Sequence, residues 1–153
     1  DKRVNTNDLR EVLVVELDNC INYLLSTSQN RVFKHFKSLL SPYNITPAEY
    51  GVLNCLINSN LNTPKAIGNT LNLEPSTISG ILDKMSKKDL ITRQTDNENR
   101  RTVLINSTNK AKDLWPTLEK KAYQLNNHYF ANLTNEETVV FKKILLKINK
   151  TTF

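Results

Sequence analysis

Short hydroxyl side chains and a glycine are concentrated at the start of one predicted helix, which begins at Pro75. These residues are Ser76, Thr77, Ser79 and Gly80. Serine and threonine hydroxyls donate and accept hydrogen bonds, and a glycine lets another molecule approach the helix backbone closely. The chemistry that this pattern offers is recognition at short range. A DNA major groove, about 12 Å wide, accepts one α-helix whose N-terminal residues meet the base edges.

The same helix ends in basic side chains. Lys84 lies one turn beyond Gly80, and Lys87 and Lys88 follow it. A lysine beside a DNA phosphate adds affinity without reading sequence. We therefore expect the hydroxyl end to meet bases and the basic end, Lys84 first, to pass the DNA backbone. The alternative is a solvated surface helix, and this helix taken alone favours that alternative.

A second basic group follows in the polar run Asp96–Arg101, at the tip of a predicted hairpin. A guanidinium of Arg100 or Arg101 could enter a narrow minor groove and sense its negative potential. Asp96 could pair with an arginine and hold the shape of the loop. The alternative is an exposed charged turn, but the helix pair before the hairpin favours a DNA contact, for Arg101 more than for Arg100.

Other kinds of site find little support in the sequence. We see no nucleophile–base pair and no glycine-rich phosphate loop, so we expect no catalytic residues and no enzyme. His35 and His128 lack cysteine or carboxylate neighbours at ligand spacing, so we expect neither a metal nor a cofactor. Cys20 and Cys55 lie in apolar surroundings on separate predicted helices, which favours reduced, buried thiols in a cytoplasmic protein.

The composition sets only broad limits on the class of protein. The 153 residues carry a net charge of +6, with 39% apolar and 24% charged residues, as in ordinary soluble domains. The charge suggests an anionic partner only weakly. No apolar run approaches the ~20 residues that cross a bilayer, so we expect no membrane partner.

Helix and strand signals predict a mainly α fold with a small β-hairpin. Apolar residues at helical spacing predict a long helix over residues 8–40, softened near residues 26–28 and stopped by Ser41-Pro42. Helix starts follow at Thr46-Pro47, Thr63-Pro64 and Pro75. The strands are predicted at 91–95 and 102–106, and two more helices follow, from Thr108 to about Phe130, where Pro116 could bend the chain, and after Thr134.

The short helix after Thr63, the break at residues 72–74 and the helix from Pro75 have the spacing of a helix-turn-helix, although the turn lacks the common glycine. The hairpin behind them is a wing. Both terminal segments have apolar helical faces that this module alone does not cover. Pairing with a second copy would bury those faces, whereas packing within one chain is the alternative.

Four stretches of this sequence resemble the MarR family of transcriptional regulators, and the hairpin is the most specific of them. They are residues 45–53, 76–84, 88–93 and 96–103. The resemblance implies a winged helix-turn-helix at 46–106 between dimerisation helices at 1–45 and 107–153, which interlock in a homodimer. It also implies a sequence-specific, double-stranded DNA-binding repressor that a small, often phenolic ligand releases from a pseudo-palindromic operator.

The chain departs from the family pattern at three positions. Asn99 stands where the family often has Asp, which weakens one ion pair of the wing. Asp89 replaces the usual glycine before a Leu-Ile pair. Gly80 stands where many members carry Arg, so sequence reading would depend on Ser76, Thr77, Ser79 and the wing.

A sensor site is the remaining expectation that the resemblance carries. In the branch of the family that senses peroxides, tyrosines hold a cysteine on the first helix. Alignment places that cysteine opposite Asn22 and one of the tyrosines opposite Phe36. Cys20 is therefore expected in the core. A ligand cleft could involve Asn22, Phe36 and Tyr50. A thiol-based redox regulator and a winged-helix protein-interaction module are the alternative functions.

Overall fold

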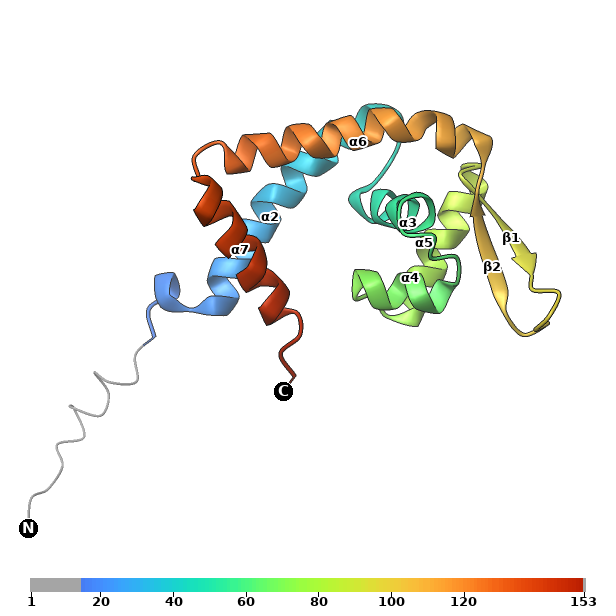
Figure 1. The fold of residues 1–153 in the computed structure, drawn as a ribbon, viewed down its shortest axis with the longest axis horizontal. Coiled ribbons are helices and arrows are strands. Elements are labelled where there is room, and N and C mark those ends of the chain that lie inside the picture. The colour runs from blue at the N-terminus through green and yellow to red at the C-terminus, as the bar shows by residue number, and fades with distance from the viewer. Residues whose placement is uncertain (1–14, 153) are drawn as a thin grey trace, which may run out of the picture. The chain divides into compact units, whose positions relative to one another are not determined.

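A computed structural model describes residues 15–152, and its fold is mainly α with one two-stranded antiparallel sheet in this part of the chain (Figure 1). The predicted fold class is confirmed. The helices and strands are α2 (Ile21–Leu40), α3 (Pro47–Ile57), α4 (Pro64–Leu71), α5 (Pro75–Lys87), β1 (Ile91–Thr95), β2 (Val103–Ser107), α6 (Asn109–Phe130) and α7 (Asn135–Ile148).

Two compact units divide the chain within α2, one of residues 1–35 and one of residues 36–153. The predicted borders at residues 45 and 106 stay a prediction. In the first unit a single 3₁₀ turn, Leu17–Asn19, precedes α2, so the expectation of one helix from residue 8 is wrong for residues 15–20. The part of that prediction at residues 8–14 lies outside the described residues. The expected softening near residues 26–28 is also wrong, because α2 is continuous there.

The helix starts confirm the capping signals of the sequence. At α3 the Thr46 hydroxyl accepts from the Glu49 backbone N–H at 3.2 Å, while the Glu49 carboxylate accepts from the Thr46 N–H at 2.9 Å. Thr134 and Glu137 repeat this capping box at α7. Each box satisfies two backbone donors that a helix start leaves unpaired. Pro116 lies inside α6, which continues across it from Asn109 to Phe130.

Two helix ends in the winged module use a left-handed residue that is not glycine. Asn72 ends α4 with φ 52°, and Asp89 follows α5 with φ 57°. After α5, the Leu90 N–H donates to the Met85 carbonyl and the Asp89 N–H to that of Ser86, both at 3.0 Å. This pair of bonds is a Schellman motif, which usually has glycine at the left-handed position. Asn72 and Asp89 thus take the place of the glycines missing from the sequence pattern.

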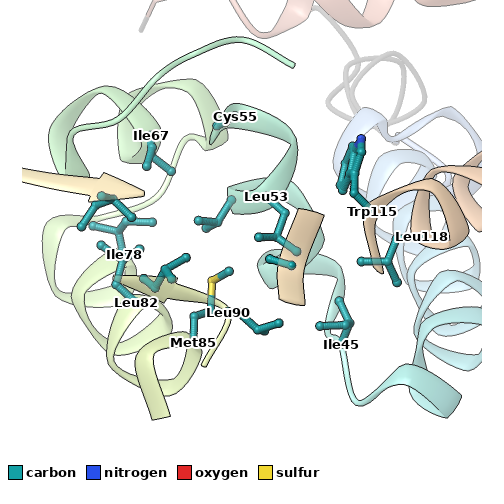
Figure 2. Close-up of a cluster of buried hydrophobic side chains, with 14 of the residues drawn as sticks. Ile45, Leu53, Cys55, Ile67, Ile78, Leu82, Met85, Leu90, Trp115 and Leu118 are labelled. Atoms are coloured by element: carbon teal, nitrogen blue, oxygen red, sulfur yellow. The ribbon is translucent and has the colours of Figure 1, made fainter. Parts of the chain in front are cut away.

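The core of the winged module is formed by α3, α4, α5 and the start of the hairpin (Figure 2). Leu53, Ile67, Leu82, Met85 and Ile105 are each at most 1% exposed. They come from α3, α4, α5 and β2, so burial fixes these elements against one another. One further backbone bond, from the Ile105 N–H to the Asn62 carbonyl at 2.7 Å, ties β2 to the chain just before α4.

Candidate nucleic-acid interface

The two faces of α5 have the character that the sequence predicts. Ile78, Leu82 and Met85 are buried against the module. All four residues of the short-side-chain group are exposed: Ser76, Thr77, Ser79 and Gly80. Lys84, one turn further along, is also exposed. The first two turns of α5 therefore offer hydroxyls and bare backbone to an outside molecule, with a cation beyond them.

No contact within the described part of the chain requires a glycine at position 80. A Cβ built on Gly51 would lie 3.0 Å from Leu71 Cδ2, and one on Gly68 would lie 3.3 Å from the Leu73 carbonyl oxygen. A Cβ on Gly80 would meet no atom within 4 Å. Glycine weakens a helix interior by about 0.5–1 kcal/mol relative to alanine. The protein thus carries that cost at an exposed position where its own packing does not require it.

The hairpin forms the predicted wing, with β2 shifted by one residue from the expected start. Its strands pair in register from Ile91 opposite Ser107 to Thr95 opposite Val103. Arg93 of β1 forms an ion pair with Asp83 of α5, which links the base of the wing to the exposed side of the helix. Both side chains are largely exposed, so this pair contributes orientation more than stability.

The wing tip is shaped by side chains that accept from its own backbone. Asp96 Oδ1 accepts from the Glu98 N–H at 3.0 Å, and Asn99 Oδ1 accepts from the Arg101 N–H at 3.2 Å. Asp96 holds the loop in this way, and the expected pairing of Asp96 with an arginine is absent from the described ion pairs. Arg100 and Arg101 are both exposed at the tip.

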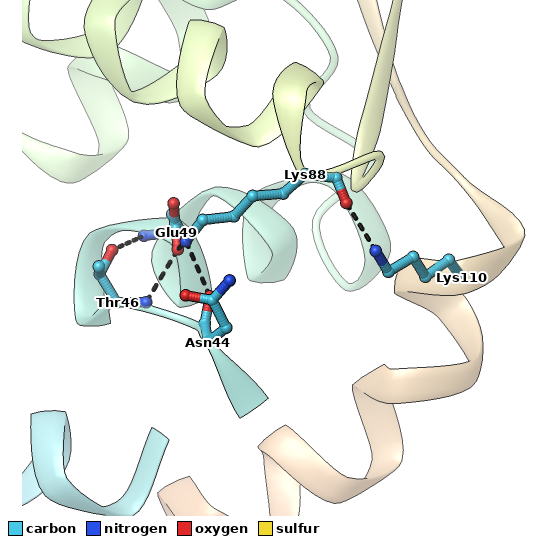
Figure 3. Close-up of polar contacts among 5 residues, drawn as sticks. All are labelled: Asn44, Thr46, Glu49, Lys88 and Lys110. Carbon is cyan, nitrogen blue, oxygen red and sulfur yellow. Dashed lines mark hydrogen bonds and ion pairs between the residues drawn. The ribbon is translucent and has the colours of Figure 1, made fainter. Parts of the chain in front are cut away.

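Lys88 does not join the exposed basic end of α5, and its expected role at DNA phosphates is wrong. Its ammonium group donates to Glu49 Oε2 at 2.9 Å and to the Asn44 carbonyl at 2.8 Å (Figure 3). The Lys88 carbonyl in turn accepts from Lys110 Nζ at 2.7 Å. The sequence did not indicate Glu49 and Lys110 as hydrogen-bond partners of Lys88. Glu49 carried only a capping signal, and its partner lies 39 residues away.

The residues expected at a ligand cleft lie in different surroundings. Phe36 contacts Tyr50 edge-on at 5.0 Å between ring centroids, and Tyr50 stacks on Trp115 at 5.1 Å. Burial raises the pKa of Tyr50, against the opposing effect of its hydrogen bond with Asn54, and the Glu119 charge raises it further. Asn22 is an exposed residue of the first turn of α2, in the other unit. The cleft formed by these three residues stays a prediction.

The cysteines differ from each other. Cys55 is buried in α3, as expected, and burial raises the pKa of its thiol. Cys20 is only partly buried and immediately precedes α2, so its expected place in a helix and in the core is wrong. The sequence missed this because apolar neighbours such as Ile21 and Leu24 are themselves exposed.

An open groove with a volume of about 620 Å³ lies beside the short-side-chain group. Its walls are mainly apolar and come from α4, α5 and both strands, with Ser79 and Arg93 among its residues.

Within residues 15–152, no helix is long and apolar enough to cross a membrane. In the same range no three His, Cys, Asp or Glu side chains are grouped so that they could hold a metal ion.

A helix pair with an exposed reading helix, followed by a two-stranded wing, defines a winged helix-turn-helix protein. A model of the MarR family matches residues 45–103. The chain is 35% identical over 94 residues to the organic hydroperoxide resistance transcriptional regulator of Bacillus subtilis; the match covers 61% of this chain and 64% of that relative. Over residues 45–103 the chain thus matches the MarR family of transcriptional regulators.

Solved structures share the fold. One is BpsR of Bordetella bronchiseptica, whose DNA binding is regulated by 6-hydroxynicotinic acid. It has a TM-score of 0.83 and a sequence identity of 19%, and the match covers 91% of this chain and 99% of that one. The repressor CouR of Rhodococcus jostii, bound to a 23-mer DNA duplex, has a TM-score of 0.77 at 22% identity, over 97% and 100%. At these identities the likeness establishes the common fold.

Proposed function

We propose that the protein is a homodimeric repressor that binds a pseudo-palindromic operator in double-stranded DNA. Ser76, Thr77, Ser79 and Gly80 of α5 meet base edges in the major groove. Lys84 meets a phosphate beyond them, and Arg100 and Arg101 enter the adjacent minor groove. The observation that carries this proposal is the exposed, short-side-chain start of α5, with a glycine that the chain's own packing does not need. The DNA-bound relative of the same fold supports it.

Exposed apolar residues outside the winged module support a dimer. In α7 they are Val139, Val140, Phe141, Ile144 and Leu146, between 45% and 65% exposed. In and before α2 they include Leu17, Ile21 and Leu24. Apolar faces of this extent are rare on monomers, and a second copy would cover them. Two-fold pairing then presents two α5 helices to half-sites about one DNA turn, ~34–36 Å, apart.

A small aromatic effector completes the proposal. The relatives of this fold include one whose DNA binding is regulated by 6-hydroxynicotinic acid and one bound to 2,4-dichlorophenol. A ligand that binds one spacing of the two reading helices better than the other would shift the dimer away from the operator. We expect such a ligand near Asn22, Phe36 and Tyr50.

The test is selection of duplexes from genomic fragments, followed by footprinting and a salt titration. We expect a protected site of about 20 base pairs, two half-sites one turn apart. We also expect a steep fall of affinity with salt, because each phosphate contact releases counterions. If no duplex is retarded and solution scattering reports a monomer, the protein-interaction module replaces this proposal. Loss of binding on adding aromatic acids or phenols would support the effector.

A thiol-based switch is a second candidate, because Cys20 is partly exposed and one relative is named for organic hydroperoxide resistance. Thiol oxidation requires access to solvent and a thiolate. If peroxide releases the operator from the protein but not from a Cys20→Ser variant, the thiol switch replaces the aromatic effector.

A further inference from the structure

Lys88 occupies a position that neither its charge nor its sequence neighbourhood predicts. It immediately follows the last residue of α5, after Lys84 and Lys87, which are both exposed. The Lys88 side chain is only 26% exposed, and its ammonium group points to Glu49 and to the loop between α2 and α3 (Figure 3). We infer that Lys88 is a positioning residue, which holds the reading helix α5 at the angle that operator recognition needs without touching DNA.

The ion-pair partner of Lys88, Glu49, is buried. Glu49 is 2% exposed, and its carboxylate accepts from Lys88 and from the Thr46 backbone N–H, both at 2.9 Å. A buried carboxylate needs a partner that neutralises it, so the lysine cannot leave without cost. The pair is therefore a fixed joint between the first turn of α3 and the end of α5.

Several segments of the chain meet at Lys88 through hydrogen bonds. Lys88 Nζ also donates to the Asn44 carbonyl, four residues beyond the end of α2, and the Lys88 carbonyl accepts from Lys110 of α6. The backbone immediately after Lys88 forms the Schellman motif with Asp89 in the left-handed conformation. Thus one residue connects the end of α5 to the α2–α3 loop, to α3 and to α6.

Lys88 and the residues proposed to meet base edges lie at opposite ends of α5. The reading residues Ser76 to Gly80 are two to three turns from Lys88 along one rigid helix, at a rise of about 1.5 Å per residue. A tilt of α5 about its buried middle moves its two ends in opposite directions. Loss of the joint at the end therefore displaces the hydroxyl groups at the start, and contacts to base edges tolerate little displacement. Contacts to phosphates by flexible lysines tolerate more.

This inference rests on the proposed function, and its test compares specific with non-specific binding. Lys88→Met keeps the length of the stem and removes the charge. Glu49→Gln removes the opposite charge, so that at most a neutral hydrogen bond from Lys88 remains, and it keeps the capping box, in which glutamine serves as well. Lys84→Met is the comparison for a lysine that contacts phosphate. The probes are the duplex selected by the wild-type protein and a duplex of the same composition with shuffled sequence.

We expect Lys88→Met and Glu49→Gln each to lower affinity for the selected duplex by about tenfold, within the effect of one mismatched base pair. The double variant should lose no more than the stronger single variant, since both break one joint. Affinity for the shuffled duplex and the salt dependence should stay unchanged. Lys84→Met should lower affinity for both duplexes and reduce the salt slope by about one.

Two outcomes of the binding assay overturn the inference. If Lys88→Met behaves like Lys84→Met, the lysine contacts phosphate. If both variants, folded by circular dichroism at the assay temperature, bind the selected duplex as the wild type does, the joint serves stability alone. Should Lys88→Met not fold, Glu49→Gln gives the same decision.

A readout without DNA separates this inference from the proposed function. Amide hydrogen exchange over residues 84–90 should be faster in both variants than in the wild type, because the end of α5 loses its joint. Unchanged exchange there overturns the inference even if no duplex is ever bound. If the wild type retards no duplex while exchange increases, the proposed function fails and the joint stands.

Discussion

Replacement of Gly80 by alanine should raise the stability of the protein and lower its affinity for DNA. Alanine at an interior helix position is more favourable than glycine by about 0.5–1 kcal/mol. The new methyl group meets no atom within 4 Å, so the whole of this gain should appear in the free energy of unfolding. For a chain of this size, 1 kcal/mol corresponds to an increase in Tm of roughly 2–4 °C.

The loss in DNA affinity follows from the same geometry. If α5 approaches base edges at Gly80, a methyl group there either clashes with a base or holds the helix away. The cost should resemble that of a mismatched base pair, about 1–3 kcal/mol per half-site. At 1.4 kcal/mol per factor of ten, that is roughly 5- to 150-fold in affinity for each half-site, and the two half-sites of the duplex multiply the effect on Kd. Thermal unfolding and fluorescence anisotropy with the selected duplex measure the two effects.

Gly51→Ala is the control for stability. Its Cβ would lie 3.0 Å from Leu71 Cδ2, so this variant should gain little or nothing. The shuffled duplex is the control for binding and should be bound equally by the wild type and Gly80→Ala. The reasoning is refuted if Gly80→Ala is more stable and binds the selected duplex as tightly as the wild type does. That result would leave Gly80 without any close contact to DNA.

Four other substitutions test separate parts of the protein. Arg101→Ala should weaken binding to the selected duplex and lower the preference for a narrow minor groove, whereas Lys84→Ala should weaken all duplexes evenly; equal operator affinity for the Arg101 variant contradicts its assignment. Asp89→Gly should stabilise by up to about 1 kcal/mol in denaturant titration, because glycine adopts φ 57° without strain. Since burial raises the pKa of Cys55, the folded state keeps that proton to higher pH than the unfolded state. Its contribution to stability is therefore complete below the ordinary thiol pKa of about 8.5 and is lost as the pH rises through the folded-state pKa, a decline that Cys55→Ala should reduce.

Local signals explain why most of the fold could be predicted from the sequence. Threonine followed by proline, with glutamate completing the box at α3, marks a helix start through bonds that span only three residues. The β-prone residues on either side of the polar turn of the hairpin and the three-to-four spacing of α5 are equally local. The exposure of Ser76, Thr77, Ser79 and Gly80 follows directly from which face carries Ile78 and Leu82.

The failures come from contacts that sequence spacing does not encode. Lys88 belongs to a basic run, and only the fold brings Glu49 and Asn44 within 3 Å of its ammonium group. Asp96 was expected to meet an arginine, but a backbone N–H two residues away is a nearer donor. Cys20 looked buried because its neighbours are apolar. Those neighbours are exposed in the single chain, and the proposed pairing with a second copy would cover them.

The left-handed residues of the winged module have a mechanical consequence. None of the three glycines has a positive φ, and the left-handed positions in and next to the module are held by Asn44, Asn60, Asn72 and Asp89. Asparagine and aspartate tolerate that conformation but have far fewer alternatives open to them than glycine has. The joints around the reading helix are therefore stiff. An effector that releases the operator should shift the module as one block, leaving its interior angles unaltered.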